Sequence, residues 1–376
     1  MAEAVRGRLV LDDAVVPGRL AIEDGWITAV EPARDDERAA AGPFIAPGFV
    51  DIHVHGWGGF DATGDAAALS GMSRALLRRG VTSFLPTAPS LPADELPRFA
   101  DRVRAWMPGA PADGAEPLGF NLEGPFLAPA RKGAHDPGVL RTPAEIDDAL
   151  LGRLLDGLRV ITIAPELPGA LALIERLAAL GVAASMGHSA ATLDEARAGY
   201  RAGARTTTHV FNAMTGVDHR APGLAVAALT DDAAYVELIA DGNHVHPALW
   251  PIITRAKPRD RLLLVSDALS LAGMGDGRTT IGGLEVEVRD GRATLLGTST
   301  LAGSVIALDT AVRNLAREGT PLPAAVAAAA ANPAALLGAS DRGRIEAGRR
   351  AHLVELDADL RVRRVTRGFG WIDAAG

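Results

Sequence analysis

The sequence contains no cysteine among its 376 residues. Without thiols the chain can form neither a disulfide framework nor a thiolate metal site. Any metal ion must therefore be bound by histidine, aspartate or glutamate side chains, and only nine histidines are present.

Basic clusters and long apolar runs are missing as well. The 46 Asp and Glu residues outnumber the 38 Lys and Arg residues, and the net charge of −8 argues against a nucleic-acid partner. The longest Ala-rich stretch, 324–331, is too short to cross a bilayer. The first residues lack the charged-then-apolar pattern of a signal peptide. We therefore expect a cytoplasmic protein with no membrane and no nucleic-acid partner.

What is present is the composition of an ordinary globular enzyme, with 48% hydrophobic and 22% charged residues. The length suffices for one large domain and a smaller one. Strand-like segments lie at both ends of the chain, with C-terminal strands expected at 343–345, 351–356 and 362–365. The simplest arrangement pairs both ends, residues 1–46 and 341–376, in one small β-sandwich domain.

Residues 47–340 alternate between strand-like and helix-like segments. Eight strands separated by helical patterns are the count of a (β/α)8 barrel. An open doubly wound sheet is the alternative, but no GxGxxG turn follows the first strand. We therefore predict an α/β fold with a TIM-like barrel over residues 47–340. Its strands are the run that ends in His53 and His55 and the segments 81–86, 119–123, 160–164, 182–186, 205–209, 236–240 and 262–266.

One region interrupts this alternation. The segments 285–288 and 293–296 are strand-like and flank Asp290-Gly291, a strong turn sequence. We predict a β-hairpin insertion near residues 275–300, beside the last barrel strand.

Metal-binding and titratable side chains gather at the predicted strand ends, where a barrel places its catalytic groups. His53 and His55 are separated by one residue, so they point to the same side of an extended strand. Several histidines and carboxylates on one face are typical of a site for Zn²⁺ or a similar metal. The later strands end in Glu123, His188, His209 and Asp267.

Short motifs carry a family resemblance. Residues 47–56, PGFVDIHVHG, are similar to the first metal motif of the amidohydrolase superfamily. Seven further motifs resemble a narrower family within it, the N-acetylglucosamine-6-phosphate deacetylases. They occupy 121–126, 132–135, 187–189, 208–214, 240–244, 266–268 and 301–304.

The resemblance implies a cofactor of one or two divalent metal ions. Glu123, His188 and His209 match the ligands of the main metal, which leaves a fourth position for water. His53 and His55 match the positions that complete a second metal in some members, with Glu123 between the two metals. Zn²⁺ is the first expectation, and Fe²⁺, Co²⁺ or Mn²⁺ suit the same ligands.

The resemblance also implies a reaction and a set of substrate-binding residues. The family removes the acetyl group of N-acetyl-D-glucosamine 6-phosphate, and Asp267 matches its catalytic aspartate, which exchanges protons with water and the leaving amine. Arg220 matches a phosphate-binding arginine that reaches in from the neighbouring subunit, so a homodimer is implied. The other matching positions are Ala134, His135, Asn212, Ala213, His244, Leu301, Ala302 and Gly303.

Each alternative function requires particular residues, which can be compared with those in the sequence. A related N-acetyl hexosamine phosphate, of galactosamine or mannosamine, is an epimer that differs in configuration at one carbon, which a few side chains can select. Cyclic amidohydrolases such as dihydroorotases usually bridge two metals with a carbamylated lysine, whereas Glu123 occupies the corresponding strand and Lys132 lies in a predicted loop. A catalytically inactive binding scaffold should have lost ligands, yet every candidate ligand is present.

Overall fold

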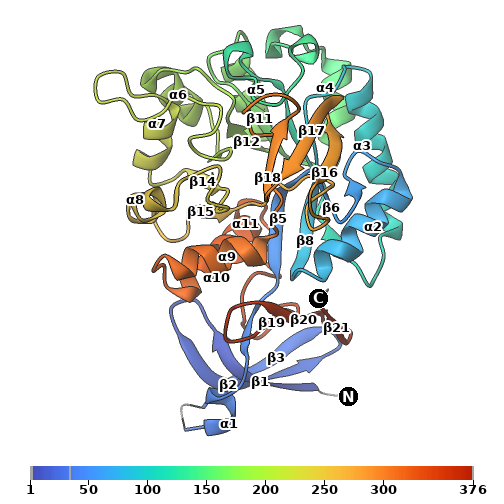
Figure 1. Cartoon of the computed structure of the whole chain (residues 1–376), viewed down its shortest axis with the longest axis vertical. Helices are drawn as coiled ribbons and strands as arrows, with labels where there is room; N and C mark the ends of the chain where they lie inside the picture. The colour runs from blue at the N-terminus through green and yellow to red at the C-terminus, as the bar shows by residue number, and fades with distance from the viewer. Residues whose placement is uncertain (1–2, 34, 375–376) are drawn as a thin grey trace.

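Two main bodies make up the computed structural model, which describes residues 3–33 and 35–374 (Figure 1). The upper body in the figure is a barrel of parallel strands with helices around it. The lower body is a separate sheet that contains both ends of the chain. The predicted fold class, an α/β barrel accompanied by a small β domain, is confirmed.

The barrel strands follow one another around the barrel in sequence order, and each pairs in parallel with the next. Hydrogen bonds between the ends of the last and first strands complete the circle: Asp267 N–H donates to His53 O at 2.9 Å, and His55 N–H donates to Ala268 O at 2.8 Å. The eight strands are β5 (Phe49–Val54), β8 (Val81–Ala88), β10 (Phe120–Phe126), β11 (Leu158–Ile163), β12 (Ala183–Met186), β13 (Thr206–Thr207), β14 (Tyr235–Leu238) and β15 (Leu262–Leu264), with the short β9 (Glu116–Pro117) added beside β8.

Amphipathic helices cover the outside of the barrel. In α3 (Glu95–Trp106), the buried residues Leu96, Phe99, Ala100 and Val103 follow the spacing i, i+3, i+4 and i+7, so one face packs inward. The other helices are α2 (Ala66–Leu77), α4 (Asp148–Leu155), α5 (Ala170–Ala179), α6 (Leu193–Arg201), α7 (Leu224–Thr230), α8 (Trp250–Ala256), α9 (Leu308–Arg317), α10 (Leu322–Ala329) and α11 (Ala331–Leu336). Among the residues described, no helix is long and apolar enough to cross a membrane.

The separate sheet, which we call the terminal sheet, joins the two ends of the chain. Its strand order is β21-β20-β19-β4-β1-β2-β3, and antiparallel pairing of β19 with β4 makes the junction. The strands are β1 (Glu3–Val10), β2 (Val15–Glu23), β3 (Trp26–Pro32), β4 (Phe44–Pro47), β19 (His352–Leu356), β20 (Val362–Arg367) and β21 (Trp371–Asp373), and the short helix α1 (Glu37–Ala40) lies between β3 and β4.

Two elements differ from the sequence-based expectation. Residues 343–345 form a bend followed by irregular backbone instead of a strand, because Gly343 has a φ of +83°. Residues 143–157, which the sequence pattern predicts as one helix before the fourth barrel strand, are divided, because Asp147 accepts a hydrogen bond from Leu150 N–H at 2.6 Å and caps a new helix there.

The region of the expected hairpin is a three-stranded antiparallel sheet, which we call the inserted sheet. It consists of β16 (Gly277–Ile281), β17 (Leu284–Arg289) and β18 (Arg292–Leu295). A further two-stranded pair, β6 (Gly56–Trp57) and β7 (Phe60–Asp61), follows the first barrel strand. Because Ile281 and Arg292 line a cavity at the carboxyl ends of the barrel strands, together with His55, Glu123 and Asp267, the inserted sheet forms one wall of the candidate site.

Candidate metal centre and active site

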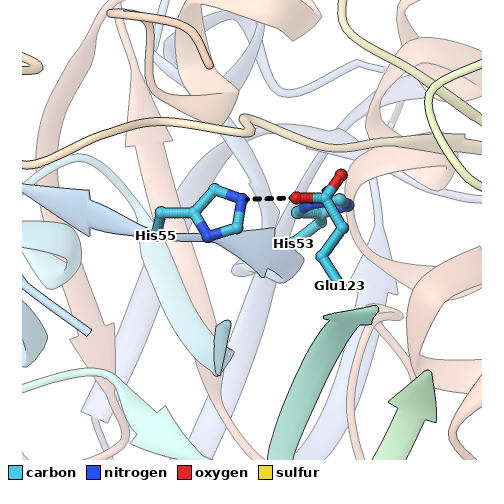
Figure 2. Close-up of side chains that lie close together, drawn as sticks. All are labelled: His53, His55 and Glu123. Carbon is cyan, nitrogen blue, oxygen red and sulfur yellow. Dashed lines mark ion pairs between the residues drawn. The ribbon is translucent and has the colours of Figure 1, made fainter. Parts of the chain in front are cut away.

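His53 and His55 at the end of β5 both turn towards the carboxylate of Glu123 on β10 (Figure 2). His55 Nε2 lies 3.1 Å from Glu123 Oε2, and His53 Nε2 lies 3.7 Å from Glu123 Oε1. The other ring nitrogen of each histidine makes a hydrogen bond on the side away from Glu123. His55 Nδ1 bonds to Thr87 O at 3.1 Å, and His53 Nδ1 bonds to Glu237 Oε2 at 3.2 Å. Both rings therefore present Nε2 to the same point, as the alternation along the strand predicts.

Glu123 also contacts the histidines from later strands. Its Oε1 lies 3.0 Å from His188 Nε2 and 2.9 Å from His209 Nε2, and these two nitrogens are 3.2 Å apart. Two ligand nitrogens at 2.0–2.1 Å from a tetrahedral Zn²⁺ lie about 3.3 Å apart. The triangle formed by Glu123, His188 and His209 therefore has the size of one face of such a coordination shell.

The backbone is strained where three of these side chains leave their strands. His188, His209 and Asp267 have φ values of 47°, 27° and 49°. Non-glycine residues rarely adopt the left-handed region, which costs on the order of 1–3 kcal/mol. Such strain is typical of functional sites, where it turns a side chain towards a common point.

Buried nitrogens without partners fit a metal ion. Within the described part of the chain, His53 Nε2 and His55 Nε2 are buried and have no hydrogen-bond partner. Leaving such an atom unsatisfied costs about 1–3 kcal/mol, so a ligand is expected there. His53, His55 and Glu123 form one group whose ligand atoms lie within 4.8 Å of one another, and the chemistry of this set fits a divalent cation.

The charges of the cluster support the same interpretation. Burial alone would raise the pKa of Asp267, but its close contact with His55 and the charges of the nearby imidazoles hold that pKa below its ordinary value. Likewise, burial would raise the pKa of Glu123, yet His135 and His53 keep it well below the usual range. The carboxylates in turn raise the pKa of His55 to about 9 against its burial. The carboxylates are thus stabilised by positive charge, which a bound cation would supply.

A cavity of about 430 Å³ opens over the cluster. Its wall includes most of the substrate-binding residues expected from the sequence, namely Ala134, His135, Asn212, Ala213, His244, Leu301 and Gly303. Ala302 is fully buried in the core of the inserted sheet instead. Arg220 is exposed on the segment after His209, and the wall built by the described residues of this chain does not include it.

His135 faces the cluster as a neutral hydrogen-bond donor. Ser90 N–H donates to its Nδ1 at 3.1 Å, so the ring proton lies on Nε2, 3.3 Å from Glu123 Oε2. Burial lowers the pKa of His135 to about 4. His244 is different, since the hydrogen bond from its Nδ1 to Asp241 Oδ2 at 2.8 Å raises its pKa against the effect of burial.

Some residues of the site were not predicted from the sequence. Arg131, Arg292, Ser299 and Thr300 line the cavity, and Glu237 is buried behind His53. The cationic side chain of Arg292 comes from the inserted sheet, whose position over the barrel no sequence pattern indicates. Glu237 offered a signal, because it is a single charged residue within the apolar strand β14.

Comparison with known proteins agrees with this geometry. The model of the Amidohydrolase family matches residues 44–369. This chain belongs to the amidohydrolase family. Its solved relatives share the whole fold: N-acetylglucosamine-6-phosphate deacetylase from Thermotoga maritima has 32% identity and a TM-score of 0.91, covering 99% of this chain and 100% of that one.

Within the amidohydrolase family, similar proteins are deacetylases of amino sugar phosphates. N-acetylgalactosamine-6-phosphate deacetylase of Escherichia coli is 38% identical, over 97% of this chain and 98% of that protein. N-acetylglucosamine-6-phosphate deacetylase of Bos taurus is also 38% identical, over 96% of this chain and 88% of that protein. The enzyme from Mycobacterium smegmatis, solved in complex with N-acetyl-D-glucosamine 6-phosphate, has 37% identity and a TM-score of 0.88, covering 98% of this chain and 99% of that one.

Proposed function

We propose that this amidohydrolase hydrolyses N-acetyl-D-glucosamine 6-phosphate to D-glucosamine 6-phosphate and acetate. The observation that carries the proposal is the position of Asp267, whose Oδ1 lies 3.2 Å from His55 Nε2 and 3.6 Å from His53 Nε2 at the floor of the cavity. A carboxylate beside a set of metal ligands can exchange protons with water and substrate. The similar deacetylases provide the substrate class.

Glu123, His188 and His209 would hold the main metal, and His53 and His55 would complete a second site with Glu123 between the two. A bound divalent metal lowers the pKa of water from about 15.7 towards 7 and polarises a carbonyl oxygen. We expect Zn²⁺, although Fe²⁺, Co²⁺ and Mn²⁺ suit the same ligands.

The residues around the metals have separate tasks in this proposal. Asp267 has a lowered pKa, so it is ionised at neutral pH and can take a proton from the attacking water. It then returns a proton to the nitrogen of the leaving amine. His135 carries its proton on Nε2 and can donate a hydrogen bond to the acetyl oxygen, which orients the amide and stabilises the charge that develops on that oxygen.

The phosphate group requires cations at the other end of the cavity. Arg292 lines the cavity together with His244, and its positive charge is close enough to oppose protonation of that imidazole. We infer that Arg292 contacts the phosphate within one subunit. Arg220, exposed on its loop, would contact the phosphate of a neighbouring subunit, which makes the protein a homodimer. The expected cytoplasmic location is part of the same proposal.

N-acetyl-D-galactosamine 6-phosphate is the alternative substrate. The Escherichia coli enzyme, at the same 38% identity as the Bos taurus enzyme, favours it, whereas the other similar deacetylases favour the glucosamine compound. The two sugars are epimers, so they share the acetamido group and the phosphate, and the same catalytic residues would serve either.

A deacetylation assay tests the proposal. Acetate release would be measured on N-acetylglucosamine, N-acetylgalactosamine and N-acetylmannosamine, each with and without the 6-phosphate. We expect the highest kcat/KM for the phosphorylated glucosamine compound. A higher value for the galactosamine compound would identify the alternative, and no acetate release from any sugar would contradict the proposed function.

A further inference from the structure

Glu237 on β14 is a fully buried carboxyl group that lies behind the metal cluster. Its Oε2 is 3.2 Å from His53 Nδ1 and 3.3 Å from the backbone nitrogen of His209. The Glu237 carbonyl accepts a further hydrogen bond from Val210 N–H at 2.8 Å. Glu237 therefore contacts one candidate ligand of each metal, through the ring of His53 and through the backbone of His209.

A buried carboxylate in this position destabilises the folded protein unless it is compensated. Burying it away from water costs several kcal/mol unless a cation or several hydrogen bonds compensate. Across the residues with a described position, its ion-pair contact is with His53, and its Oε1 is buried without a hydrogen-bond partner. An apolar residue would pack in strand β14 at lower cost, so the presence of glutamate requires a benefit at His53.

The geometry at His53 supplies that benefit. When Glu237 accepts a hydrogen bond from Nδ1–H, the lone pair of Nε2 is directed into the cluster, where Glu123 Oε1 and Asp267 Oδ1 lie 3.7 and 3.6 Å away. A carboxylate behind a ligating histidine also raises the basicity of the ring, and its loss typically weakens metal binding 10–100-fold.

His53 in β5 and His55 just after it are not equivalent in this respect. His55 Nδ1 is held by the backbone carbonyl of Thr87, a neutral acceptor that no side-chain substitution removes. His53 Nδ1 is held by the carboxylate of Glu237, which a substitution can remove. Of the two histidine ligands expected for the second metal, His53 is therefore the one whose orientation a side-chain substitution can change.

We propose that Glu237 is a positioning residue that fixes His53 as a ligand and thereby sets the affinity for the second metal ion. The proposal rests on the binuclear site described under the proposed function. Glu237 does not line the substrate cavity. Its carboxylate contacts the ring of His53 but only the backbone of His209, so its effect on a ligating nitrogen passes through His53. Removing its charge should weaken the second metal and leave the first almost unchanged.

The test uses protein from which a chelator has removed the metal. Zn²⁺ is then titrated into it, and isothermal titration calorimetry measures the affinity and the number of ions bound. Wild type should bind two ions. E237Q should bind the first ion with an affinity within about threefold of wild type and the second about 10–100-fold more weakly, with Glu237→Ala at the weaker end of that range. Glu237→Asp, which keeps the charge on a shorter side chain, gives the same readout if the neutral variants fail to fold, and its second ion should also bind more weakly.

Two controls separate positioning from general stability. Glu355, buried in the terminal sheet and paired with Arg363 and Arg364, is the matched carboxylate, so Glu355→Gln should lower the melting temperature without changing either affinity. In a His53→Ala background, E237Q should have no additional effect on the second ion.

Two results would overturn the inference. The first is a set of Glu237 variants that bind both ions with wild-type affinities and differ from wild type in stability alone. The second is a wild-type protein that binds a single ion, which would leave a mononuclear deacetylase possible. A protein that binds two ions and responds to E237Q as described, but releases no acetate, would contradict the proposed function and support the role of Glu237.

Discussion

The two ends of the barrel use buried polar groups in opposite ways. At the carboxyl ends of the strands, His53 and His55 present buried Nε2 atoms that, within the described ranges, have no hydrogen-bond partner. At the amino ends, Arg342 makes four hydrogen bonds, to Ser83 on β8, to Glu116 and to Asp341. The open nitrogens of His53 and His55 mark the end of the barrel where we expect a metal ion, whereas the hydrogen bonds of Arg342 hold the other end together.

The paired end also joins the two bodies of the molecule. Arg367 of the terminal sheet donates to Glu116 Oε2 at 3.2 Å, and Glu116 receives Arg342 at 3.0 Å on the same oxygen. Burial would raise the pKa of Glu116, but the charge of Arg342 and the other cations keeps it below its ordinary value. Substitutions at this end should therefore change stability, whereas substitutions at the other end should change chemistry.

The largest effect is expected at Asp267. Asp267→Asn keeps the shape of the side chain but cannot take a proton, so turnover should fall about 10²–10⁴-fold. Metal content and melting temperature should remain close to wild type. Acetate release and metal analysis of the same preparation check this, and a variant with full turnover would remove Asp267 from the mechanism.

Removal of both His53 and His55 should have the next largest effect. His53→Ala combined with His55→Ala should reduce the metal content from two ions to one per chain, because Glu123, His188 and His209 remain. Elemental analysis after dialysis against excess metal measures it. Two ions in the double variant would place the second metal elsewhere.

Arg342→Ala tests the paired end. Removing one member of a buried ion pair leaves the others unpaired, and we expect a loss on the order of 3 kcal/mol in the free energy of unfolding. Metal content and kcat should be unchanged, as urea unfolding and acetate assays would reveal. Arg74→Ala is the control, because Arg74 pairs with Asp113 on the surface, where a pair contributes about 0–1 kcal/mol.

How much the sequence could predict depends on the kind of contact. The positions of Glu123, His188, His209 and Asp267 were predictable, because parallel strands bring their carboxyl ends to one face. The inserted sheet was recognised as strands, but its placement over the cavity depends on the packing of Ile281 and its neighbours, which leaves no periodic signal. The network of Arg342 joins positions more than 200 residues apart, so no local pattern reports it.

Arg292→Ala should affect binding of the phosphate. We expect the KM for the phosphorylated sugar to rise about tenfold, because one charged hydrogen bond is lost, while the KM for the unphosphorylated sugar stays the same. Arg289→Ala is the matched control, since Arg289 belongs to the same inserted sheet and pairs with Glu287 at 3.4 Å. Equal effects on both sugars would argue against contact with the phosphate.

The last effect concerns the pH dependence of stability at the paired end. Burial, followed by the charge of Arg342, lowers the pKa of His352 to about 3, whereas the unfolded chain has an ordinary value near 6.5. Between these values the unfolded chain binds a proton that the folded protein does not. The free energy of unfolding should therefore fall as the pH drops below about 6.5, by up to about 1.4 kcal/mol per pH unit from this residue.

His352→Gln should flatten the dependence of stability on pH between about 6.5 and 4. The exposed His246 provides the control, because His246→Gln should leave the slope unchanged. Urea unfolding at several pH values measures the slopes, and a slope in His352→Gln equal to that of wild type would contradict the assignment.

Anomalous diffraction from crystals of the metal-loaded protein tests the contrast between the two ends most directly. We predict two metal peaks at the carboxyl ends of the strands, one among Glu123, His188 and His209 and one among His53, His55 and Glu123, and none near Glu116. A single peak, or a peak away from Glu123, would contradict the binuclear centre.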